Sequence, residues 1–137
     1  MQLRPRYGEV DKMGYVYHAN YVCYCHQART ELLRNYGIND SALEENNMMV
    51  PVISFEIEYK KPAKYDDLLT IKTTIEEIPV VRFHFNFEIV NEENHTICKA
   101  KSTIVFMDSK SRYPIMVPDF VKNALKKNFN NKVYASN

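Results

Sequence analysis

The chain has 137 residues, of which 45% are hydrophobic and 26% charged, and this size and composition are typical of one globular domain rather than a disordered, fibrous or membrane protein. A formal net charge of +1 gives no long-range attraction to nucleic acid or anionic lipid. The sequence has no stretch of about 18 apolar residues, so membrane insertion is not predicted. Three cysteines without metal-ligand spacing, and no apolar segment of the signal-peptide kind, favour a cytoplasmic protein with free thiols.

The first third of the chain predicts a strand and then a long helix. Residues 3–9 are expected to form the first strand. Between residues 20 and 36 apolar side chains recur every three to four positions, which predicts a mostly buried helix. Gly37 then acts as a stop, because glycine tolerates the left-handed conformation just past a helix. Residues 41–44 read Ser-Ala-Leu-Glu, a capping box that predicts a short second helix.

After Pro51 the hydrophobic period changes from about 3.6 to 2 residues. Strict alternation of apolar and polar residues predicts half-buried strands over 53–59, 69–75 and 81–89. A turn at 91–94 leads into a long strand over 96–107, whose inward face begins with small residues that let a helix lie close to the sheet. Short turns between these strands favour antiparallel neighbours.

The end of the chain predicts a C-terminal helix at about 118–128 with a frayed tail after it. We therefore expect a single domain over residues 1–137 with an α+β fold, in which a curved antiparallel sheet wraps a long central helix. A long free sheet edge in so small a domain is an aggregation hazard, so the chain is expected to pair with a second copy.

The segment that joins the first strand to the long helix carries the candidate chemistry. Asp11 lies in a loop, Gly14 permits an unusual backbone conformation, and the helix begins between Tyr17 and Tyr21. Free amides at a helix start suit a developing oxyanion, such as the one that forms when a thioester carbonyl is attacked. A nearby carboxylate could deprotonate water or attack the carbonyl itself. No metal site is predicted, since the two neighbouring cysteines point to different helix faces.

Residues 11–21 have the pattern D-x-x-G-x-V-Y-H-A-N-Y, followed by Ala-Arg-Thr-Glu at 28–31. With the section 59–68, Tyr-Lys-Lys-Pro-Ala-Lys-Tyr-Asp-Asp-Leu, this order resembles the 4-hydroxybenzoyl-CoA thioesterase-like branch of hotdog-fold acyl-CoA thioesterases, including the Tol-Pal-associated type. The resemblance covers about residues 3–108. It implies that Asp11 is the catalytic carboxylate and that the backbone N–H of His18 polarises the thioester carbonyl.

The resemblance also implies an assembly and a substrate. The expected assembly is a homodimer with a continuous sheet, or a homotetramer, with each active site at a subunit boundary. The expected substrate is an acyl-CoA or an acyl-carrier protein, and no cofactor is needed because coenzyme A is part of the substrate. The residues predicted to contact the substrate are Gly14, Tyr17, Tyr21, Lys61 and Arg82.

This sequence departs from the family's commonest pattern at two places. Glu9 stands where an aspartate often precedes the catalytic one by two positions, and little consequence is expected. The residues before Phe83 lack the basic cluster that some members use to hold coenzyme A phosphates. The remaining histidines are expected to be structural or solvated, and Glu31 is expected to pair with a neighbouring arginine rather than act as a base.

Three functions compete at this stage. The first is hydrolysis of an acyl thioester to a free acid and a thiol, with Asp11 as base or nucleophile. A hotdog hydratase or dehydratase would use a histidine with a helix carboxylate, and the Asp-x-x-Gly loop argues against it. A non-catalytic dimer that binds acyl thioesters or a partner protein would tolerate Asp11→Asn without loss, whereas a hydrolase would not.

Overall fold

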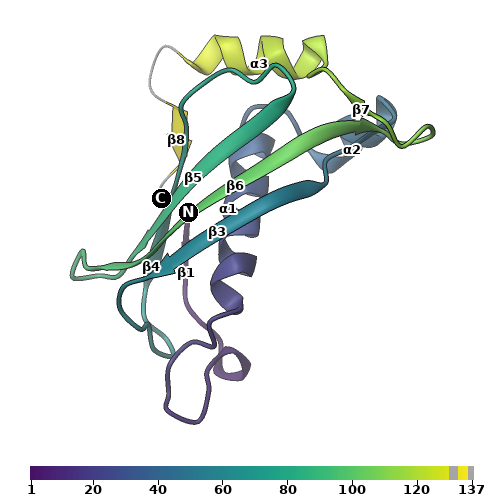
Figure 1. The fold of residues 1–137 in the computed structure, drawn as a ribbon. Helices are drawn as coiled ribbons and strands as arrows, with labels where there is room; N and C mark the ends of the chain where they lie inside the picture. Colours follow the sequence, from purple (N-terminus) through teal and green to yellow (C-terminus); the bar gives the residue numbers. More distant parts are fainter. Residues whose placement is uncertain (130–132, 136–137) are drawn as a thin grey trace.

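The computed structural model describes residues 1–129 and 133–135. The predicted long helix is confirmed as α1 (Asn20–Asn35), and Gly37 follows it with a φ of +81°. One face of α1 is buried along its whole length, with Tyr21, Tyr24, Cys25, Ala28, Arg29, Leu32 and Leu33 covered. Figure 1 shows this helix lying against the sheet, as the small inward residues predicted.

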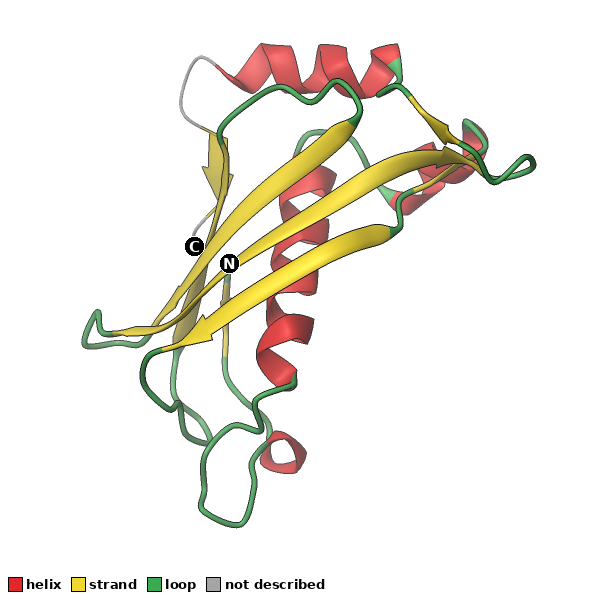
Figure 2. Cartoon of the chain, viewed as in Figure 1, coloured by secondary structure: helices red, strands yellow, loops and turns green. Residues whose placement is uncertain are grey.

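The four predicted strands are confirmed as β3 (Val52–Tyr59), β4 (Leu69–Ile75), β5 (Arg82–Val90) and β6 (Thr96–Asp108). They pair antiparallel in the spatial order β4, β5, β6, β3. Four short strands extend this sheet: β1 (Gln2–Leu3) and β8 (Val133–Ala135) pair with β4, and β2 (Met48–Met49) and β7 (Pro114–Ile115) pair with the far end of β6. The sheet therefore curves around one side of α1 (Figure 2).

The core lies between α1 and the inner face of the sheet. Alternate residues of the two longest strands fill it, namely Phe83, Phe85, Phe87 and Ile89 from β5 with Cys98, Ala100, Ser102, Ile104 and Phe106 from β6. The opposite face of these strands carries charged and polar side chains. This two-sided pattern is the reason the inward-facing residues could be predicted from the sequence.

Two local predictions were wrong, and one strand boundary differs by a residue. Residues 3–9 are not a strand: β1 ends at Leu3, and Tyr7–Glu9 form a 3-10 turn, η1, because the Glu9 carboxylate accepts a hydrogen bond from the Arg6 N–H at 2.8 Å. The second helix, α2 (Asp40–Glu45), is capped by Asn39 rather than Ser41, with the Asn39 side chain accepting from the Ala42 N–H. The strand predicted from residue 81 begins at 82, and Val81 is exposed.

The C-terminal helix is present as α3 (Asp119–Phe129) and crosses one end of the sheet (Figure 1). The predicted frayed tail falls partly on residues 130–132 and 136–137, outside the described residues, while β8 between them pairs with β4 and was not predicted. In the part of the chain that the structure describes, no helix is long and apolar enough to cross a bilayer.

The strand β3 forms one edge of the sheet, since it pairs only with β6 among the described residues. The predicted inward residues Phe55 and Ile57 are only partly buried, and Ile53 and Tyr59 are exposed. Strand β3 is therefore an edge that a single chain leaves incompletely covered, as the sequence predicted for one edge of the sheet.

Candidate active site

Asp11 sits in a tight loop between two residues, Val10 and Val16, that form an isolated antiparallel bridge. The Asp11 N–H donates to the Tyr15 carbonyl at 2.8 Å, and Gly14 completes the turn with a φ of +82°, which favours glycine. One carboxylate oxygen of Asp11, Oδ1, accepts from the Met13 N–H at 2.9 Å and the Tyr15 N–H at 3.2 Å. The side chain is thus held in one orientation.

The second carboxylate oxygen of Asp11, Oδ2, makes no hydrogen bond within the described part of the chain. A carboxylate has about four acceptor positions on its two oxygens, so half of this group is free for a substrate or a water molecule. Asp11 therefore caps its own loop with Oδ1 and leaves Oδ2 available. The turn-capping role does not exclude a chemical one.

The start of α1 supplies backbone donors beside this carboxylate. The Asn20 N–H donates to the Tyr17 carbonyl at 2.9 Å, and the Tyr21 N–H donates to the His18 carbonyl at 3.4 Å. Neither the His18 N–H nor the Ala19 N–H donates to any residue that the structure describes. Such donors at a helix start carry partial positive charge and attract a developing anion.

Asp11 and His18 line the same open cleft, which has a volume of about 320 Å³. The other lining residues are Tyr15, Val16, Tyr21, Tyr59, Lys60, Lys61 and Pro62. The floor is held together from two sides, since the Val16 N–H donates to the Ala63 carbonyl at 2.8 Å and the Tyr21 hydroxyl accepts from the Ala63 N–H at 3.1 Å. Burial raises the pKa of Tyr21, so its hydroxyl stays protonated.

Glu9 fastens the loop to the helix from the other side. Its backbone carbonyl accepts from the Tyr17 N–H and from the Asn20 side chain, and its carboxylate accepts from the Tyr24 hydroxyl at 2.9 Å. Desolvation acts to raise the pKa of Glu9, but the hydrogen bonds from Arg6 and Tyr24 outweigh it and the pKa is lowered. Glu9 is therefore ionised and structural at neutral pH.

The structure brings four of the predicted site residues together at this cleft, namely Asp11, His18, Tyr21 and Lys61. Gly14 shapes the Asp11 loop without lining the cleft. Tyr17 is half-exposed, with its ring centroid 4.5 Å from that of His18.

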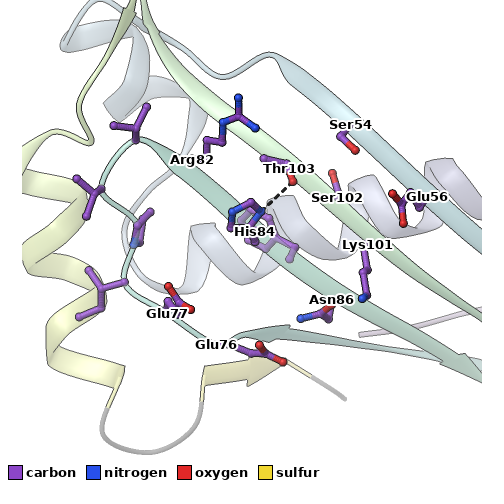
Figure 3. Close-up of a pocket in the computed structure, with 15 residues that line it drawn as sticks. Ser54, Glu56, Glu76, Glu77, Arg82, His84, Asn86, Lys101, Ser102 and Thr103 are labelled. Carbon is purple, nitrogen blue, oxygen red and sulfur yellow. Dashed lines mark hydrogen bonds between the residues drawn. The ribbon is translucent and has the colours of Figure 1, made fainter.

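Arg82 lies elsewhere, in a second cavity of about 500 Å³ on the outer face of the sheet (Figure 3). There His84 Nδ1 and Thr103 Oγ1 are 2.9 Å apart, and Lys101 stands opposite Glu56 in the β3–β6 register, while the buried Ser102 hydroxyl has no hydrogen-bond partner among the described residues. Nothing in the described structure joins this outer groove to the Asp11 cleft.

Sequence reasoning missed Tyr59 as a residue of the cleft. The alternation of β3 predicted an inward-facing side chain, but Tyr59 is the last residue of the strand and its hydroxyl donates to the His18 carbonyl at 3.2 Å. A tyrosine at the end of an edge strand, directly before a lysine pair, is the only sequence signal for this position. The contact spans 41 residues of chain, so no local pattern reveals it.

The remaining chemistry-bearing side chains offer no second centre in the described residues. Burial raises the pKa of Cys98 to about 12 and also raises that of Cys25, so both thiols are protonated and poorly nucleophilic at neutral pH. Glu31 pairs with Arg34, as predicted. Within residues 1–129 and 133–135, no three metal-binding side chains lie close enough to hold a metal ion.

Comparison with known proteins places the chain among thioesterases. Residues 5–125 match the family model described as the thioesterase-like superfamily. The chain is 34% identical over 116 residues to the acyl-CoA thioester hydrolase YbgC of Escherichia coli, covering 85% of this chain and 87% of that one. It is 31% identical to the acyl-acyl carrier protein thioesterase ATL2 of Arabidopsis thaliana, covering 90% of this chain and 65% of that one.

Solved structures agree with these relatives. The DHNA-CoA thioesterase of Staphylococcus aureus superimposes with a TM-score of 0.80 at 25% identity, covering 96% of this chain and 83% of that one. An Aquifex aeolicus protein superimposes with a TM-score of 0.84 at 28% identity, covering 91% and 97%. The predicted α+β hotdog fold is thereby confirmed.

Proposed function

The chain belongs to the thioesterase-like superfamily and hydrolyses acyl-CoA thioesters to a free acid and a thiol, and we propose that this reaction takes place in the Asp11 cleft. One observation carries the proposal. The Asp11 Oδ2 atom and the His18 N–H belong to residues that line one cleft, and neither has a partner among the described residues. An unpaired acceptor beside an unpaired donor is what attack on a carbonyl requires.

The proposed steps use these two groups in different roles. The thioester carbonyl oxygen accepts a hydrogen bond from the His18 N–H, which stabilises the negative charge that develops on this oxygen. Asp11 Oδ2 takes a proton from a water molecule as the water oxygen bonds to the carbonyl carbon. The tetrahedral intermediate then breaks its carbon–sulfur bond, and the departing thiolate takes the proton that Asp11 had accepted, which restores the carboxylate. In a second route Asp11 attacks the carbon directly, the carbon–sulfur bond breaks and releases the thiolate, and water then cleaves the resulting anhydride to free acid and the Asp11 carboxylate.

Lys61 is proposed to hold the phosphate end of coenzyme A at the mouth of the cleft. Its neighbour Lys60 forms an ion pair with Glu58 at 2.6 Å, whereas the Lys61 ammonium has no partner within the described residues. An unpaired ammonium is a good point contact for phosphate. This arrangement would replace the basic cluster that the sequence lacks before Phe83.

A homodimer joined along β3 is part of the proposal. An edge strand with partly covered apolar residues, such as Phe55 and Ile57, is suited to pair with a second copy. Residues 59–62 follow the end of this edge strand and line the cleft. A partner subunit bound along β3 would therefore cover the open side of the cleft. Sedimentation of the purified protein as a monomer at micromolar concentration would contradict this.

The competing functions have less support from the geometry. A hydratase needs a histidine working with a carboxylate, but the His18 ring lies beside the rings of Tyr17 and Tyr59. A non-catalytic binding module gives no reason for an acceptor and a donor to be left unpaired in one cleft. The proposal needs no cofactor beyond coenzyme A in the substrate, and it places the enzyme in the cytoplasm, which its free cysteines favour.

The test is a thiol-release assay with purified protein over short, medium, long and aromatic acyl-CoAs, with acyl-carrier proteins as a second set. Release that is lost in the Asp11→Asn variant is the expected result. Release by the wild type that persists in Asp11→Asn would contradict the proposed site. Release from the carrier proteins alone would show that the thiol belongs to a carrier protein and not to coenzyme A. The proposed role of Lys61 would then be wrong as well.

A further inference from the structure

Tyr59 connects the edge strand to the start of the helix across the cleft. Its hydroxyl donates to the His18 carbonyl oxygen at 3.2 Å, and its ring centroid lies 5.7 Å from that of Tyr21 and 6.1 Å from that of His18. The Tyr21 N–H also donates to this carbonyl oxygen, but at a longer 3.4 Å. The phenol of Tyr59 is thus the closer of these two donors.

The His18 carbonyl belongs to the peptide group that carries the Ala19 N–H. A trans peptide group is planar, with its carbonyl and its N–H pointing in opposite directions, so a hydrogen bond that fixes one end fixes the direction of the other. Donation to a carbonyl oxygen also polarises the peptide group and strengthens its N–H as a donor. The Ala19 N–H has no acceptor in the described structure.

We infer that Tyr59 is a positioning residue for thioester hydrolysis, whose hydroxyl orients the peptide group between His18 and Ala19 so that the Ala19 N–H serves with the His18 N–H as a second donor to the carbonyl oxygen of the substrate. The inference rests on the proposed function. It assigns a role to a residue outside the N-terminal segment and adds a backbone donor to the site.

The two tyrosines of the cleft have separate tasks. The Tyr21 hydroxyl accepts from the Ala63 N–H and is buried, so it stabilises the floor. The Tyr59 hydroxyl donates, and its side chain is 45% exposed at the rim. Removal of the Tyr59 hydroxyl is therefore expected to change the direction of a peptide group and not the packing of the core. Burial raises the pKa of Tyr59, which keeps the phenol protonated as a donor at neutral pH.

The test is Tyr59→Phe, which removes only the hydroxyl, measured beside Tyr113→Phe. Tyr113 is 72% exposed in the connection between β6 and β7 and takes no part in the cleft. We expect Tyr59→Phe to lower kcat by about 3- to 10-fold with KM changed less than about 2-fold, because one neutral hydrogen bond acting in the transition state has this effect on rate. The thermal midpoint of unfolding of Tyr59→Phe should equal that of Tyr113→Phe.

A second readout does not depend on activity. In nitrogen-15 spectra of the full protein, the Ala19 amide signal should move in Tyr59→Phe and stay in place in Tyr113→Phe. Wild-type activity with equal kcat in both variants and an unmoved Ala19 signal would overturn the role of Tyr59 and leave the proposed function intact. A wild type that hydrolyses no acyl thioester would overturn the proposed function, and this role with it.

Discussion

The outer groove around Arg82 and the cleft around Asp11 differ in size and in chemistry, and the larger one has the weaker claim to be the active site. The groove has about 500 Å³ and the cleft about 320 Å³. In the groove, Lys101 stands opposite Glu56, and the buried Ser102 hydroxyl has no hydrogen-bond partner among the described residues. In the cleft, a carboxylate oxygen of Asp11 and the backbone N–H of His18 have no partner among the described residues. An unpaired carboxylate oxygen beside a helix start, and not volume, indicates where a thioester is hydrolysed.

The regular register of the strands orders the charges on the outer face of the sheet, on which the groove lies. Across the outer face, Lys72 stands opposite Glu88, Glu88 opposite Lys99, and Lys99 opposite Glu58, so the sign of the charge alternates from strand to strand. Cross-strand pairs of this kind stabilise a sheet by roughly 0.2–1 kcal/mol each. The cleft lies where a tight loop, a helix start and a strand end meet, and no repeating register pairs its polar groups.

The largest expected effect is that of Asp11→Asn on hydrolysis. The amide keeps an oxygen to accept from the Met13 N–H, so the loop holds, but it is a poor base and a poor nucleophile. We expect kcat to fall by about 10²–10⁴-fold, as measured by thiol release, because loss of a positioned base typically costs this much. Binding of a non-hydrolysable thioether analogue of the substrate should persist.

Asp108→Asn is the matched control for the turn-capping role. Its Oδ1 accepts from the Lys110 N–H and the Ser111 N–H, two and three residues later, as Asp11 Oδ1 accepts from backbone N–H groups two and four residues later. These hydrogen bonds lower the pKa of Asp108. Equal losses of activity in the two variants would show that Asp11 acts only as a turn residue.

The next largest effect is expected on stability, from Tyr21→Phe. The variant leaves the Ala63 N–H at the floor of the cleft without its acceptor, and an unpaired buried donor costs about 1–3 kcal/mol. Denaturant unfolding should show this loss. His84→Phe in the outer groove removes an exposed contact with Thr103 and should cost less than about 0.5 kcal/mol. A reversed order would mean that the groove is the more tightly built of the two regions.

Lys61→Gln and Arg82→Gln compare the two regions for binding of the nucleotide end of the substrate. Loss of the Lys61 ammonium should raise KM for acyl-CoA by about 3- to 10-fold with kcat nearly unchanged, since one exposed charge contact to phosphate contributes roughly this much. The increase should shrink at high salt. Arg82→Gln should leave KM within about 2-fold. A larger increase in KM from Arg82→Gln than from Lys61→Gln would show that the nucleotide binds in the outer groove.

Glu9→Gln gives the smallest effect, seen as a change in pH dependence. The pKa of Glu9 in the folded chain lies below its ordinary value of 4.5, so the ionised group stabilises the fold above that pH and loses this contribution as the pH falls through the folded pKa. Near neutral pH the variant should be less stable than the wild type by about 1 kcal/mol or less. The difference should disappear in acid, and a difference that grows in acid would contradict the assignment.

The regular parts of the molecule were predictable and the junctions between them were not. Alternation placed Phe83, Phe85 and Phe87 on the inner face correctly because one face of the sheet is buried. The 3-10 turn at Tyr7–Glu9 was missed because a carboxylate–backbone hydrogen bond, and not periodicity, decides it. Within the cleft, the N-terminal motif predicted Asp11 and His18. Tyr59 lies on a strand far from this motif in the sequence, so no local pattern predicts its contact with His18.

Chemical-shift mapping with a non-hydrolysable acyl-CoA thioether tests most directly which region binds substrate. Nitrogen-15-labelled wild-type protein would be titrated and every assigned amide followed. We expect the largest changes at Asp11, His18, Ala19 and Lys61, with little change at His84. Changes confined to the outer groove, around His84 and Lys101, would contradict the assignment of the Asp11 cleft as the active site.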